Sequence, residues 1–140
     1  MLINEIINNH SVKIPKIMNG EDLLVSKHLF DRISERRIKP QRVVDGIVYA
    51  IRHYKEDFGN LPIGATLVLR DPTKFGIALS KIENTAGSIY WIVKTAHKRL
   101  YNVGGDIELP IPNIVETPKI TESISFDTFV DLFQDSIKHK

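Results

Sequence analysis

The spacing of apolar residues changes from a helical period to a strand period near the middle of this chain. Before the change, Val43, Ile47, Ile51 and Tyr54 recur at intervals of four, four and three residues. Such spacing places them on one face of a helix. Pro40 suits the first helical position, because proline lacks the N–H that would remain unpaired there. The pattern therefore predicts a helix from Pro40 to about residue 55.

A shorter helix is predicted just before this one, over residues 27–37. Ser26 is a suitable N-cap, because its hydroxyl can accept a hydrogen bond from a backbone N–H of the first turn. Leu29, Phe30 and Ile33 would share one face of the helix and pack in the core. Residues 1–22 show only weak periodicity and predict no defined element.

The second half of the chain carries the strand pattern. After a break at residues 59–62, strands are predicted over residues 66–70, 75–81 and 88–97, and residues 100–103 extend the third strand or form a fourth. The short connections favour antiparallel neighbours. The predicted fold class is therefore α+β: two N-terminal helices packed on a small antiparallel sheet of three to four strands, with a C-terminal helix.

The length of 140 residues and the hydrophobic fraction of 42% suit a single domain. Within it we distinguish a lead segment (1–22), an α+β core (23–103), a proline-containing extended strap (104–124) and an amphipathic helix (125–140). Ser125 can cap this helix, whose stripe includes Phe126, Phe129 and Phe133. The stripe packs on its own domain or on a partner, and the second alternative would make it a functional surface.

Several functional classes have no support in the sequence. The chain has no cysteine, so disulfides and thiolate chemistry are excluded, and its five histidines lack the short spacings of a zinc site. We expect no metal and no cofactor. No apolar run is long enough for a transmembrane helix, and the first ten residues do not resemble a signal peptide. We expect no membrane partner and a cytoplasmic location, or delivery into the cytoplasm of a target cell.

Positive charge is concentrated in the middle of the chain. Residues 26–102 contain fourteen Lys and Arg against seven Asp and Glu, whereas both flanking segments are net acidic. A basic block of this kind is typical of a domain that binds polyanions such as nucleic acids, because phosphate neutralisation provides much of their binding energy. The alternative is ordinary charge scatter on a solvated surface.

Three charged side chains would form a stripe along the first predicted helix. His28, Arg32 and Arg36 are separated by four residues each and would lie beside the core-facing side chains. One imidazole and two guanidinium groups could offer a proton-transfer group and forked donors to one phosphate. The alternative is a solvated helix with Asp31 and Glu35 as counter-charges.

A second cluster, residues 94–99, ends the third predicted strand. Strict alternation would place Thr95 and His97 on the face of Trp91 and Val93, and Lys94 and Lys98 on the opposite face. If the helices cover the Trp91 face, Thr95 and His97 would approach the helical stripe. The alternative for His97 is a solvent-exposed position at a strand end.

RNA cleavage is the reaction that these residue types could most simply catalyse without metal or thiol. A base removes the proton of the ribose 2′-OH, its oxygen attacks the adjacent phosphorus, and an acid protonates the leaving 5′ oxygen. The product is a 2′,3′-cyclic phosphate, and cations stabilise the phosphorane charge. The candidate catalytic residues are His28, Arg32, Thr95 and His97, with the two histidines as acid and base; the candidate substrate-binding residues are Arg36, Lys94, Lys98 and Arg99.

The chain resembles small nucleases of the barnase, EndoU, colicin and RelE-like group. The resemblance rests on residues 25–38 (VSKHLFDRISERRI), on the second helix that follows them, and on strands that end in Thr-Ala-His-Lys. The group includes toxin domains and phage-encoded members, and the resemblance covers residues 23–103. It implies roles for His28 and Arg32 on the early helix, and for Thr95, His97 or Lys98 on the late strand. Because Glu83 falls in a predicted loop, a base centred on His or Lys is favoured over glutamate.

The leading prediction is therefore a metal-independent endoribonuclease of toxin or effector type. Its expected partners are RNA, such as tRNA or mRNA, and an immunity or antitoxin protein. A non-catalytic RNA- or protein-binding module on the same scaffold is the alternative.

Overall fold

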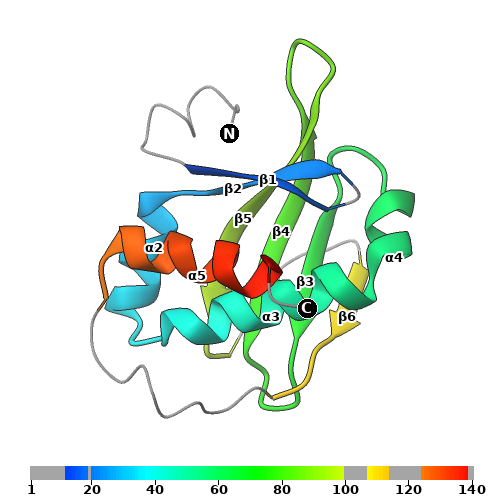
Figure 1. Cartoon of the computed structure of the whole chain (residues 1–140). Coiled ribbons are helices and arrows are strands. Elements are labelled where there is room, and N and C mark those ends of the chain that lie inside the picture. The colour runs from blue at the N-terminus through cyan, green and yellow to red at the C-terminus, as the bar shows by residue number, and fades with distance from the viewer. Residues whose placement is uncertain (1–11, 19, 100–106, 114–123, 139–140) are drawn as a thin grey trace.

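A six-stranded sheet organises the computed structural model, which describes residues 12–18, 20–99, 107–113 and 124–138 (Figure 1). The helices α2, α3 and α5 cover one face of the sheet, and their apolar residues share a core with that face. The elements in chain order are β1 (Val12–Met18), β2 (Glu21–Val25), α2 (Lys27–Glu35), α3 (Pro40–His53), α4 (Lys55–Asn60), β3 (Thr66–Arg70), β4 (Gly76–Glu83), β5 (Ile89–His97), β6 (Ile107–Pro110) and α5 (Phe126–Lys138). The predicted α+β class and C-terminal helix are confirmed.

The sheet is larger than predicted, and it is mixed. Its strand order is β1-β2-β5-β4-β3-β6, with β2 parallel to β5 and β3 parallel to β6, while the other three pairs are antiparallel. The prediction of three to four antiparallel strands was wrong because short connections reveal only neighbouring hairpins. Parallel partners are joined by long crossovers, which leave no local signal.

The additional strands lie in segments that were predicted to have no regular element. The β1–β2 pair lies in residues 12–25, and Gly20 has a φ of 83°, a left-handed conformation that glycine adopts without steric cost. Strand β6 lies within the predicted strap and ends at Pro110, at the edge of the sheet. The possible strand at residues 100–103 falls outside the described residues.

The local signals that fix the helices were predicted correctly. The Ser26 hydroxyl accepts a hydrogen bond from the backbone N–H of Leu29 at 3.0 Å, and Pro40 occupies the first turn of α3. The Ser125 hydroxyl accepts from the N–H of Thr128 at 3.1 Å at the start of α5. Helix α2 ends at Glu35 rather than at residue 37, because Arg37 adopts a left-handed φ of 58°.

Helix α5 packs on its own domain. The rings of Phe129 and Phe133 are fully buried, and the Phe129 ring lies 5.4 Å from that of Phe30 on α2. Its aromatic stripe therefore closes the core over α2 and α3 and is not free to bind a partner.

A buried lysine on β4 forms hydrogen bonds to the end of α4. Lys81 is only 6% exposed, and its Nζ donates hydrogen bonds to the backbone carbonyls of Phe58, Gly59 and Leu61 at 3.1, 3.4 and 2.8 Å. These carbonyls lie at the end of α4, where the helix itself provides no donors.

We expect Lys81→Met to lower the free energy of unfolding by about 1–3 kcal/mol, because methionine fills the space but leaves buried carbonyls without a donor. Urea denaturation measures the change, and Lys94→Met, at an exposed position of β5, is the control. An unchanged midpoint would mean that the lysine contributes no net stability.

Candidate functional site

The candidate site lies where β5 extends beyond its parallel partner. Pairing of β2 with β5 ends at Leu24 and Ile92, after which the chain turns into α2. Arg36, the C-cap residue of α2, reaches this edge: its Nη1 donates to the Thr95 hydroxyl and to the Ala96 carbonyl, both at 3.1 Å. One member of the predicted helical stripe therefore contacts the predicted strand cluster.

His97 lies close enough to Arg36 for the two to interact electrostatically. Partial burial, together with the positive charge of Arg36, lowers the pKa of His97 below the usual 6.5. The imidazole is therefore neutral near pH 7 and can accept a proton. Its strand partner is Gly76, the first residue of β4.

Strict alternation along β5 fails at Lys94. Val93 pairs with Leu79 and Thr95 pairs with Ala78, so Lys94 has no counterpart on β4 and forms a β-bulge. Beyond it, Ala96 joins Trp91 and Val93 in the core. Thr95 and His97 therefore lie on the face turned away from the helices, and the prediction that they share the face of Trp91 was wrong.

Arg36 contacts Thr95 although the two come from different sides of the sheet. The long guanidinium side chain reaches β5 at its edge, where none of the strands that the structure describes pairs with β5 after β2 ends. The predicted proximity of stripe and cluster is therefore found, but at the edge of the strand and not beneath the helices.

The other two members of the stripe contact each other. Arg32 Nε donates to His28 Nε2 at 3.3 Å, and both side chains are exposed. At a rise of ~1.5 Å per residue, the Cα atoms of His28 and Arg36 are roughly 12 Å apart along the axis of α2. The hydrogen bonds from the stripe to β5 thus come from Arg36, which was predicted to bind substrate. The predicted catalytic pair, His28 and Arg32, lies nearer the start of α2.

Exposed cations lie at the end of β5. Asp31, a predicted counter-charge of the stripe, pairs with Lys27 at 3.1 Å on the exposed surface. Lys94, Lys98 and Arg99 are exposed on β5 or directly after it. Glu83 is the last residue of β4 rather than part of a loop, and it pairs with Ile89 at the opposite end of the sheet from His97.

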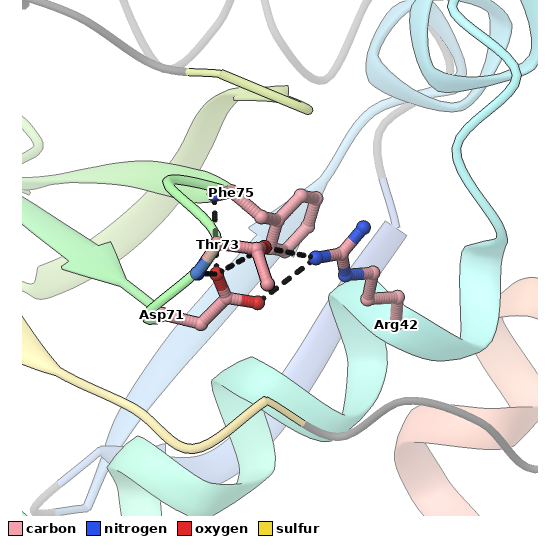
Figure 2. A network of polar contacts seen from close by, with 4 residues as sticks. All are labelled: Arg42, Asp71, Thr73 and Phe75. Carbon is pink, nitrogen blue, oxygen red and sulfur yellow. Dashed lines mark hydrogen bonds and ion pairs between the residues drawn. The ribbon is translucent and has the colours of Figure 1, made fainter.

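A polar network that was not predicted from the sequence supports the turn next to the site (Figure 2). Asp71 Oδ1 accepts from the N–H and hydroxyl of Thr73 at 2.8 and 2.6 Å and from the N–H of Phe75 at 3.2 Å. Arg42 Nη2 on α3 donates to Asp71 Oδ2 at 2.9 Å, and its guanidinium lies 4.1 Å from the centre of the Phe75 ring. The Asp-Pro-Thr sequence predicted a turn, but nothing local indicates its partner Arg42.

This network positions the strand that pairs with His97. Phe75 directly precedes Gly76, which pairs with His97 across the β4–β5 ladder. The end of β5 therefore contacts β4, which follows the turn held by Asp71, and it also bonds to Arg36 of α2.

Among the described residues, no group of three or more His, Asp or Glu side chains is arranged to hold a metal ion. Over the same residues, no helix has both the length and the apolar character that a bilayer span requires. Comparison of the chain with family models, curated proteins and solved structures found no match.

Proposed function

We propose that this protein is a metal-independent endoribonuclease whose site is the edge of β5. The observation that carries the proposal is the bonding of Arg36 to Thr95 beside a half-buried His97 with a lowered pKa. A neutral imidazole, a hydroxyl and a permanent cation at one strand end provide a general base and charge stabilisation for cleavage of a phosphodiester. The resemblance to small nucleases that was predicted for residues 23–103 is part of the same proposal.

In the proposed reaction, His97 accepts the proton of the ribose 2′-OH. The 2′ oxygen then forms a bond to phosphorus, the bond from phosphorus to the 5′ oxygen breaks, and the 5′ oxygen takes up a proton. Arg36 would stabilise the charge that develops on the phosphorane oxygens. The acid predicted from the sequence is His28, whose Nε2 accepts a hydrogen bond from Arg32, so it would serve as the proton donor only after that bond is released.

Lys94, Lys98 and Arg99 would bind flanking phosphates, since all three are exposed on β5 or directly after it. Their charge suits RNA such as tRNA or mRNA in the cytoplasm of the producing or a target cell. An acidic immunity or antitoxin protein that covers this end would inhibit the enzyme by occupying the phosphate sites.

The test is cleavage of RNA by the purified protein in the presence of EDTA. We expect products with 2′,3′-cyclic phosphate ends, and no cleavage of RNA whose 2′-OH groups are methylated. Loss of activity with EDTA, or products with 3′-hydroxyl ends, would contradict the proposed mechanism.

An RNA-binding module without catalysis is the second candidate, and one observation favours it. His28 Nε2 already accepts from Arg32, and Arg36 already has two acceptors within the protein. For a binder we expect His28→Gln to keep RNA affinity, whereas Arg32→Ala reduces both the affinity and its dependence on salt. Loss of affinity on His28→Gln would count against this alternative.

A further inference from the structure

The core does not require the residue that forms the bulge in β5. Val93 and Ala96 both pack in the core although three positions separate them, whereas alternation puts residues two apart on one face. Without Lys94, Trp91, Val93 and Ala96 would follow strict alternation, and the pairs of Val93 with Leu79 and of Thr95 with Ala78 could remain. The core members and the flanking pairs therefore do not account for the inserted residue.

The bulge does change which side chains lie together on the other face. Adjacent residues of a regular strand point to opposite faces, but a bulge sets two residues against one on the partner strand. Thr95 pairs with Ala78, and the unpaired Lys94 directly before it is exposed. An exposed ammonium group is thereby added next to the hydroxyl that Arg36 holds.

We propose that the bulge at Lys94 is part of the substrate site and that the inserted lysine binds an RNA phosphate beside the pair of Arg36 and Thr95. The proposal rests on the proposed function in that the ligand is RNA, but it does not require cleavage. By charge alone, Lys94 could not be distinguished from Lys98 and Arg99. The bulge gives Lys94 a position beside Thr95 that the other two do not share.

The first experiment measures how the affinity for a single-stranded 2′-O-methyl RNA depends on salt, because this RNA cannot be cleaved by 2′-OH attack. For Lys94→Ala we expect the slope of log K against log salt to decrease in magnitude by about 0.7, the value for one lost contact with a single strand. Lys27→Ala, which removes an exposed lysine at the start of α2, is the matched control and should leave the slope unchanged. Equal slopes for Lys94→Ala and the unmodified protein would overturn the proposal.

The second experiment deletes Lys94 and records the melting temperature and the same RNA affinity. We expect a melting temperature at or above that of the unmodified protein, because the ladder becomes regular, together with weaker RNA binding. A decrease of several degrees would show that the bulge serves the fold and would overturn the proposal. Both experiments measure binding and stability and do not measure cleavage. If the protein does not cleave ordinary RNA, the nuclease proposal is refuted, but the proposed role of Lys94 in binding RNA is not.

Discussion

Replacing His97 with glutamine is expected to lower kcat/KM for RNA cleavage by about 10²–10⁴-fold, the usual contribution of a general base. Glutamine keeps the size and polarity of the side chain but cannot accept the proton of the 2′-OH. The rate is measured on a short RNA with EDTA present. His53→Gln, which changes an exposed histidine on α3, is the control and should retain full activity. Full activity of the His97 variant would exclude it as the base.

The pH dependence of this step follows from the lowered pKa of His97. A base must be unprotonated, so the midpoint of the decrease in kcat/KM on the acid side should lie below pH 6.5, the usual pKa of histidine. Since the charge of Arg36 is one cause of the shift, Arg36→Gln should move the pKa of His97 up toward 6.5. Titration of the imidazole by NMR measures this directly. A pKa that does not move would mean that burial alone causes the shift.

Replacing Asp71 with alanine is expected to lower the free energy of unfolding by about 3–5 kcal/mol, the cost of removing one partner from a buried ion pair. The Asp71 side chain is only 2% exposed, and it accepts from Arg42, from two N–H groups and from the Thr73 hydroxyl. The substitution would leave the guanidinium of Arg42 without its carboxylate and would release the turn between β3 and β4 (Figure 2).

Urea denaturation measures the effect on stability. Asp127→Ala, which removes an exposed carboxylate on α5, is the control and should shift the midpoint little. Asp71→Asn should cost less than alanine, because the amide oxygen can still accept from Thr73. A change below about 1 kcal/mol for Asp71→Ala would mean that Arg42, whose side chain is 26% exposed, is satisfied by solvent and by the Thr73 hydroxyl instead.

The elements that depend on neighbouring residues were predictable from the sequence. Ser26, Pro40 and Ser125 fix helix starts by contacts within one turn, and strand β3 was predicted with its observed bounds. The parallel pairs were not predictable in this way, because β2 and β5 are separated in the sequence by five other elements, α2, α3, α4, β3 and β4.

The residues of the candidate site were predicted from the sequence, but their arrangement in space was not. Arg36, Thr95 and His97 were identified from their spacing, yet the face on which Thr95 and His97 lie was wrong because one inserted residue reverses the alternation. The register at Lys94 is set by the pairing of β5 with β4, which no pattern within β5 reveals. Arg42 and Asp71 are 29 residues apart, so their ion pair depends on the assembled fold.

The position of Arg36 also bears on how the edge of β5 meets other chains. Beyond β2, none of the described strands pairs with this edge, to which a strand from another chain could add, and the guanidinium bonds to the Ala96 carbonyl there. Substrate phosphate would compete with that carbonyl for the same cation. Loss of Arg36 would leave that carbonyl without its side-chain donor, so a change in association could accompany a change in the proposed activity. His97 makes no such bond in the described structure and is therefore the better residue to replace in a test of the proposed catalysis.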